Sequence, residues 1–148
     1  MKLTALSICL LLLSGCGDFP RDPLGTLERV RAERSFRVGM VAPLGDRPDA
    51  AVQRLLEQVA AASSARPVLV RGDSEPLLNR LEEGELDLVI GRFEAASPWA
   101  TMVSFAPPLR VERQGSTDFN LGAAMRNGEN GWIALVEAAS RDSAEPQP

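Results

Sequence analysis

The sequence predicts an α/β domain in which helices flank a mostly parallel sheet that has antiparallel strands at its edge. Three short apolar runs alternate with two helical patterns along the first part of the chain. Strands that are separated by helices pair in parallel through right-handed crossovers. Two further extended segments follow with no helix between them, which favours antiparallel pairing. About 130 residues remain after an N-terminal leader, which is enough for one domain.

The first elements are a short helix and a strand. Thr26 is expected to cap a helix over residues 27–33, because a threonine side chain can accept a hydrogen bond from the first helical turn. In residues 35–41 every second side chain is large and apolar, which is typical of a strand with one buried face. A loop with two prolines and a glycine follows.

The clearest helix comes next. Asp49 can cap it, and apolar residues then recur at the 3.6-residue period until the pattern fades near Ser64. Residues 67–71 are rich in aliphatic and β-branched side chains, and we expect them to form a short buried strand.

A second helix and a third strand repeat this arrangement. Asp73 or Ser74 can cap the helix, and Gly84 is expected to end it in a left-handed conformation. Residues 86–92 follow as an apolar strand, so the three predicted strands are joined by two helical crossovers.

The pattern changes in the last third of the chain. Residues 101–110 and 119–126 are extended segments separated by Gly115, and we expect them to pair antiparallel at the edge of the sheet. A final helix carries Trp132 among its apolar positions, which predicts a core residue. Residues 140–148 contain two prolines and are expected to form a disordered tail.

The N-terminus is typical of a secretory leader. A lysine precedes an apolar run of about nine residues, far short of the roughly 20 that a membrane-spanning helix needs. Residues 13–16, Leu-Ser-Gly-Cys, resemble the lipobox of bacterial lipoproteins. The resemblance implies that residues 1–15 are removed, that Cys16 is acylated and that residues 16–25 tether the domain to a membrane outside the cytoplasm. The resemblance also favours the outer membrane slightly over the inner one, because Gly17 stands where the family's inner-membrane retention signal would place an acidic residue; the nearby Asp18 leaves both membranes open. The alternative is an ordinary signal peptide that is cleaved elsewhere.

Composition excludes several kinds of chemistry. The chain has no histidine and no tyrosine, and its single lysine lies in the leader, so a serine-histidine triad, a histidine-bound metal and a catalytic lysine are unavailable. No enzyme, metal or cofactor is therefore expected. The leader holds one of the 16 basic residues and none of the 20 acidic residues. The mature chain thus carries a net charge of about −5, which disfavours a nucleic-acid partner.

The order of elements resembles that of bacterial extracellular solute-binding proteins of family 3. Residues 26–33 (TLERVRAE) and 36–40 (FRVGM) resemble the opening of that family. Residues 77–91 (LLNRLEEGELDLVIG) resemble its helix and strand that lead to the ligand cleft, and residues 103–109 (VSFAPPL) resemble the segment that enters its hinge. The similarity weakens in residues 123–132.

The resemblance implies a single-lobe, three-layer, periplasmic-binding-protein-like domain over residues 26–139. Family members have two lobes that close on a ligand, but only about a dozen residues lie between the Phe105 region and the strand near Leu121, where the second lobe would be inserted. The family's arginine for the ligand carboxylate aligns with Trp99. Its threonine is replaced by Glu94 or Ala96. An amino-acid ligand is therefore not carried over.

Ligands of open α/β sheets bind in the crevice beyond the carboxyl ends of the strands. Arg92 and Glu94 could offer one cation and one anion there, or form a solvated or mutually paired surface couple. Trp99 could be a platform for a ligand, an anchor in a protein interface or a lid over the edge of the sheet. The side chains expected to contact a ligand or partner are Leu44, Ser74, Arg92, Glu94, Ser97 and Trp99.

These observations predict a membrane-anchored lipoprotein that acts as an accessory or solute-binding subunit of an envelope transport system. Its expected partners are the membrane, through the lipid on Cys16, and a transporter or other envelope protein. Two alternatives remain open: a small-ligand binder that uses the open crevice alone, and a degenerate single-lobe interaction module that binds no ligand.

Overall fold

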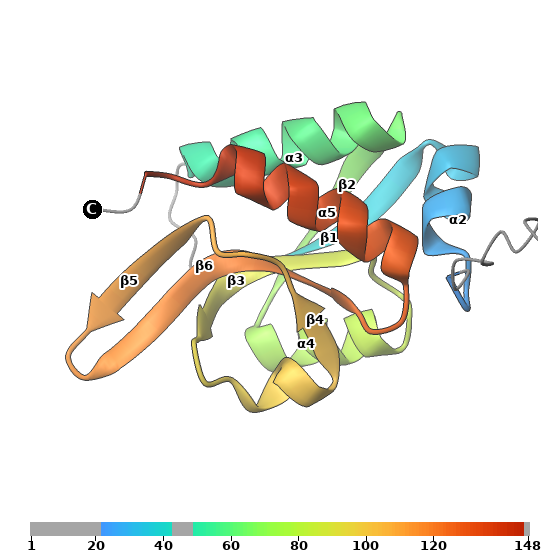
Figure 1. The fold of residues 1–148 in the computed structure, drawn as a ribbon. Coiled ribbons are helices and arrows are strands. Elements are labelled where there is room, and N and C mark those ends of the chain that lie inside the picture. Colours follow the sequence, from blue (N-terminus) through green and yellow to red (C-terminus); the bar gives the residue numbers. More distant parts are fainter. Residues whose placement is uncertain (1–21, 43–48, 147–148) are drawn as a thin grey trace, which may run out of the picture.

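The computed structural model describes residues 22–42 and 49–146. The predicted leader, Cys16, Leu44 and the last two residues of the predicted tail lie outside the described residues. The described chain forms three layers, with helices on both faces of one sheet (Figure 1). No described helix is long and apolar enough to cross a membrane. The helices are α2 (Thr26–Glu33), α3 (Ala50–Ser63), α4 (Ser74–Glu82) and α5 (Asn130–Ser143).

Six strands form the sheet, in the order β2-β1-β3-β6-β4, with β5 also paired to β6. β1 pairs in parallel with β2 and β3, whereas β6 pairs antiparallel with β3, β4 and β5. Five strands therefore run in one direction and only β6 opposes them, which confirms the predicted fold class. The strands are β1 (Ser35–Val41), β2 (Arg66–Gly72), β3 (Leu88–Glu94), β4 (Val103–Phe105), β5 (Arg110–Gln114) and β6 (Thr117–Arg126).

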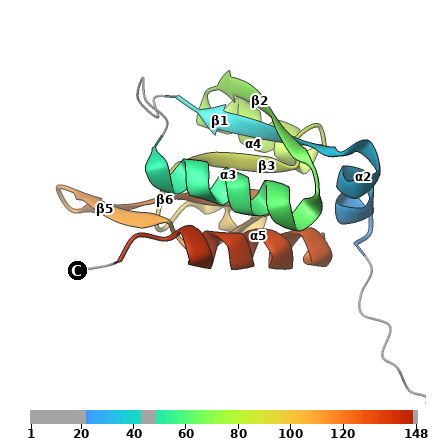
Figure 2. The same ribbon diagram turned by 90° about the horizontal axis from the view of Figure 1, so that it is seen from above.

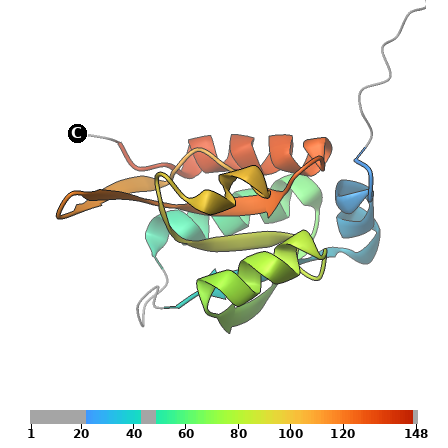
Figure 3. The same ribbon diagram turned by 90° about the horizontal axis from the view of Figure 1, so that it is seen from below.

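Two apolar clusters hold the layers together. On one face α3 and α5 lie side by side over the sheet (Figure 2), and the ring of Trp132 packs against Phe36 with centroids 5.7 Å apart. Trp132 is fully buried, so its prediction as a core residue is confirmed. On the other face, seen in Figure 3, α4 packs its leucines Leu77, Leu78 and Leu81 against the sheet.

The strand over residues 67–71 was expected to be buried, and this prediction is wrong. β2 is the edge strand of the sheet, and Val68 and Leu69 are 51% and 52% exposed. An apolar run of this length is compatible with either position, because exposure depends on whether a further strand pairs with it.

Both ends of the domain extend further than predicted. α5 continues to Ser143, and the Ser140 hydroxyl donates a hydrogen bond to the Pro107 carbonyl at 2.8 Å, so residues 140–143 are helical and not a disordered tail. Residues 22–25, expected in the tether, are packed against the domain: Asp22 Oδ1 accepts from the Gly131 N–H at 2.6 Å. Gly25, at φ +62°, takes the N-cap position predicted for Thr26.

A hairpin stands where a second lobe would be inserted. β5 and β6 are joined by a turn that contains Gly115 at φ +63°, and their joined end projects beyond the helices (Figures 1 and 2). The predicted antiparallel pairing of this region is confirmed. β6 is more central than expected, because its other side pairs with β3.

Candidate functional site

A crevice of about 420 Å³ lies at the carboxyl ends of the parallel strands, over the end of β3. It is the place where the sequence predicted a site, and it brings together five of the six predicted residues. Leu44 lies outside the described residues. The crevice is lined by Ser74, Arg92, Glu94, Ser97, Trp99 and Phe119, together with Leu78, Phe93 and Pro98.

Arg92 does not offer a free cation to this crevice. Its Nε lies 2.7 Å from Glu112 Oε2, and its guanidinium carbon lies 5.0 Å from the centre of the Phe119 ring. A guanidinium binds a ligand through its N–H edge or its flat face. In Arg92 the ion pair with Glu112 engages the edge at Nε, and the Phe119 ring covers one face. Arg92 therefore pairs with Glu112 and not with Glu94, so the predicted alternative of a mutual Arg92–Glu94 pair is wrong.

Glu94 is the last residue of β3 and is exposed. It forms no ion pair with any residue that the structure describes. Because Arg92 is paired with Glu112, this carboxylate is the only charged group without an ion pair among the described residues that line the crevice. The crevice therefore favours a positively charged group.

Trp99 lies in a short 3₁₀ helix, η2 (Pro98–Thr101), which interrupts the loop expected in this region. Ser97 caps this turn, since its Oγ accepts from the Trp99 N–H at 3.3 Å. The Trp99 ring is half-buried and packs against the apolar cluster beneath α4. It thus covers part of the sheet and also lines the crevice; a contact with a partner protein stays a prediction.

Ser74 is the first residue of α4, and its neighbour Asp73 occupies the N-cap position. The Asp73 side chain makes no capping hydrogen bond. Asp73 therefore stands at the predicted N-cap position, but its side chain does not form the predicted capping hydrogen bond.

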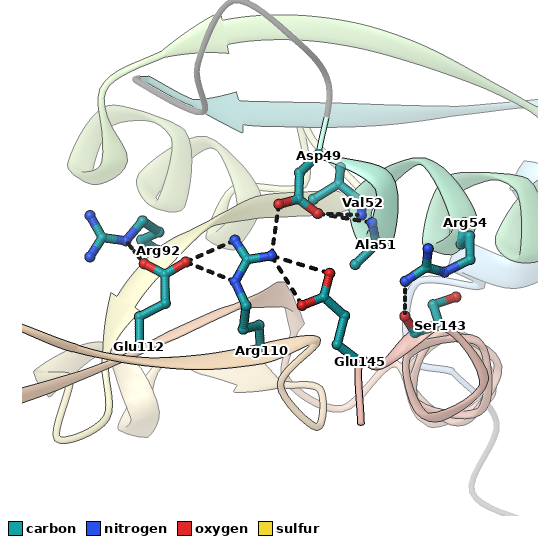
Figure 4. Close-up of polar contacts among 9 residues, drawn as sticks. All are labelled: Asp49, Ala51, Val52, Arg54, Arg92, Arg110, Glu112, Ser143 and Glu145. Atoms are coloured by element: carbon teal, nitrogen blue, oxygen red, sulfur yellow. Dashed lines mark hydrogen bonds and ion pairs between the residues drawn. The ribbon is translucent and has the colours of Figure 1, made fainter. Parts of the chain in front are cut away.

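A network of charges extends from Arg92 away from the crevice (Figure 4). Glu112 accepts from Arg110 through Oε1, at 2.8 Å from Nη2 and 3.0 Å from Nε. Arg110 Nη1 in turn lies 3.0 Å from Asp49 Oδ2 and 3.4 Å from Glu145. The network joins β3, β5, the start of α3 and the C-terminal segment.

The network shifts the titration of its members. The hydrogen bonds that Arg110 donates to Glu112 raise the pKa of Arg110, and the contacts with Asp49 raise it further, against the effect of burial. Burial pushes the pKa of Asp49 upward, but hydrogen bonds from Arg110 and from the Ala51 N–H outweigh it, so that pKa is lowered. Both shifts favour the charged forms of Arg110 and Asp49 at neutral pH.

Sequence reasoning missed Glu112, Arg110 and Phe119. Arg110 and Glu112 are two residues apart on β5, so their side chains lie on one face of the strand, and this spacing was the available signal. To predict from this spacing that Glu112 would reach Arg92, one would also need the register of β5 against β6, in which Glu112 pairs with Phe119. Within the part of the chain that the structure describes, no group of three or more acidic or cysteine side chains could hold a metal ion.

Comparison by sequence finds little. No protein-family model matches the chain, and no curated protein matches it. Comparison by structure finds domain 1 of TmArgBP in its arginine-bound form, with a TM-score of 0.64 and 15% identity over 77% of this chain and 97% of that chain.

The chain has the fold of a solute-binding protein lobe. The ancestral cationic amino acid solute-binding protein AncCDT-1 is similar with a TM-score of 0.65 and 11% identity, over 79% of this chain and 93% of that one. An amino acid ABC transporter substrate-binding protein from Streptococcus pneumoniae, bound to L-arginine, has a TM-score of 0.62 and 9% identity, over 79% and 91%. The predicted resemblance to solute-binding proteins is confirmed at the level of the lobe fold.

Proposed function

We propose that this chain is a lipid-anchored solute-binding subunit of an envelope transport system and that it works outside the cytoplasm. The lobe fold supports a solute-binding role, and the leader with its lipobox-like residues supports the anchor at Cys16. AncCDT-1 is also described as a precursor of cyclohexadienyl dehydratase. We nevertheless propose binding without catalysis here, because histidine, tyrosine and lysine are missing from the mature chain.

The observation that carries the proposal is the crevice. It gathers residues from the end of β3, the start of β6, the start of α4 and η2. Among the described residues, its carboxylate without an ion pair, Glu94, shares the crevice with the Trp99 ring, while Arg92 already lies over the Phe119 ring. A carboxylate that shares a crevice with an aromatic ring is suited to an ammonium or guanidinium group. We therefore propose that the solute is a small organic cation.

A single lobe can hold a solute, since domain 1 of TmArgBP is in an arginine-bound form. An amino acid would need, besides a partner for its cationic group, a partner for its α-carboxylate. Arg92 is already engaged by Glu112 at 2.7 Å, so such a carboxylate would have to displace that ion pair. We expect a cation without a carboxylate to bind more tightly than the corresponding amino acid.

The test uses agmatine and arginine, which differ only in the carboxylate, as ligands in calorimetric titrations of the mature chain. We expect agmatine to bind and arginine to bind more weakly. Glu94→Gln should weaken agmatine binding about tenfold, the loss of roughly one charge-assisted hydrogen bond. Glu57→Gln removes an equal charge from an exposed position on α3 and should change nothing. Absence of saturable binding for both ligands would contradict the proposal and favour an interaction module without ligand.

The anchor is tested separately. Mass spectrometry of the mature protein from the membrane fraction should find an acylated N-terminal Cys16, and Cys16→Ser should release the protein into the soluble fraction. An unmodified mature chain in the soluble fraction of cells that carry the natural sequence would contradict the anchor, with no consequence for the crevice.

A further inference from the structure

A second cavity, of about 270 Å³, lies at the opposite end of the sheet from the crevice. Three arginines from different elements line it: Arg29 from α2, Arg37 from the start of β1 and Arg126 from the end of β6. None of them has a part in the crevice, and the function proposed above does not use them.

Two of these arginines share one buried carboxylate. Asp87 is 4% exposed, and its Oδ2 accepts from the Arg37 backbone N–H at 2.7 Å and from Arg37 Nε at 3.1 Å. Its Oδ1 accepts from Arg37 Nη2 at 2.8 Å and also from Arg29. Asp87 is thereby saturated, while each guanidinium keeps N–H groups that Asp87 does not use.

Arg126 is held in place without a carboxylate. Its Nε is buried and has no hydrogen-bond partner, and it forms no ion pair with any residue in the described ranges. Its guanidinium lies against Gly84, where a Cβ would overlap Nη2. Gly84 also has φ +80°, a conformation that favours glycine. A buried donor without a partner costs stability and calls for an explanation.

The acidic residues of the cavity limit the charge of a ligand. Glu129 is committed to the backbone N–H groups of Leu24 and Thr26, and Glu83 is exposed. Arg29 and Arg37 are paired with Asp87, and Arg29 Nη1 also donates to Glu33 Oε2 at 3.1 Å, so among the described residues Arg126 is the lining arginine without an ion pair. A singly charged anion is therefore more suitable than a doubly charged one. Guanidinium groups match the geometry of phosphate oxygens.

We propose that this cavity binds the phosphate of a phosphodiester, through Arg126 and the unused N–H groups of Arg29 and Arg37. If Cys16 is acylated, five residues separate it from Asp22 at this end of the domain, a reach of at most about 20 Å. Phospholipid headgroups then lie within reach of the cavity, and the solute crevice at the other end of the sheet faces away from the membrane.

The cavity itself does not depend on the anchor, so the experiment uses a mature chain in which Cys16→Ser prevents acylation. Glycerophosphoglycerol, a soluble phosphodiester, is titrated while the Arg126 Nε–H signal is followed by NMR. Binding to phosphatidylglycerol vesicles is compared with binding to phosphate-free galactolipid vesicles brought to the same surface charge with oleate. We expect the Arg126 signal to shift and the phosphatidylglycerol vesicles to bind more protein.

Arg126→Gln should weaken phosphodiester binding about tenfold, whereas Arg113→Gln, which removes an equal charge at the hairpin, should change it less than twofold. Gly84→Ala keeps the charge but displaces the guanidinium and should also weaken binding. Arg126→Gln should not lower Tm, because the replaced group has a buried N–H without a partner.

A response to glycerophosphoglycerol alone would support the site and identify soluble phosphodiesters as its ligands. No shift of the Arg126 signal with either phosphate source would overturn the proposal. So would equal losses in Arg126→Gln and Arg113→Gln, since those would indicate attraction by net charge only.

Discussion

Glu129→Ala should be among the most destabilising single changes in this domain. Glu129 is 1% exposed, and its carboxylate accepts from the Leu24 N–H at 2.9 Å and from the Thr26 N–H at 2.8 Å. The alanine would leave two backbone donors without partners. A hydrogen bond to a charged group contributes about 1.5–3 kcal/mol, so the loss should be about 3 kcal/mol. For roughly 120 ordered residues this corresponds to a Tm lower by about 10 °C.

Urea unfolding monitored by circular dichroism measures this loss directly, and amide exchange at Thr26 should accelerate in parallel. Glu137→Ala is a matched control within α5, the helix that Glu129 precedes, because Glu137 makes only a half-exposed contact of 3.5 Å with Arg141. Its expected cost is below about 0.5 kcal/mol. The Glu129 side chain does not cap α5, so a change in capping cannot account for the loss. A cost below about 1 kcal/mol for Glu129→Ala would refute the reasoning.

Three further outcomes are expected. Burial pushes the pKa of Glu129 upward, but its hydrogen bonds outweigh this and lower it, as they do for Asp49. The stability that these carboxylates contribute is then full above their ordinary pKa of about 4 and is lost as pH falls through the lowered pKa values. Urea titrations between neutral pH and pH 3 measure this loss of unfolding free energy. A free energy of unfolding that does not change with pH in this range would contradict the prediction. Asp49→Ala should cost about 1–2 kcal/mol by thermal unfolding, and Asp49→Asn about half as much, because asparagine restores the cap but not the ion pair with Arg110. Trp99→Ala should lower Tm by several degrees, because the ring packs on the apolar cluster beneath α4; an unchanged Tm would mean that the ring only covers a surface that a partner or ligand uses.

The type and order of the elements could be predicted where the local pattern was strong. α3 follows the predicted cap and periodicity, since Asp49 Oδ1 accepts from the Ala51 N–H at 2.9 Å. The burial of β2 could not be predicted in this way. Whether Val68 and Leu69 are covered depends on a neighbouring strand and not on their own sequence.

The candidate crevice was predictable in position but not in chemistry. Parallel strands bring their carboxyl ends to one edge of the sheet, which is why Ser74, Arg92 and Glu94 line one crevice. The engagement of Arg92 by Glu112 could not be foreseen, because it depends on the position of β5 in the sheet.

The sequence by itself determined the fold class, the absence of histidine and tyrosine chemistry, and the edge of the sheet at which a solute site should be sought. These follow from periodicity and composition, which are local or additive properties. Only the tertiary structure decided which charges are satisfied. Glu129 reaches the Thr26 N–H across 103 positions, and Asp87 serves guanidiniums 50 and 58 positions away. Pairing of this kind depends on distances in space that no local pattern encodes, so the groups left without a partner among the described residues, the Glu94 carboxylate and the Arg126 Nε–H, emerge only once the chain is folded.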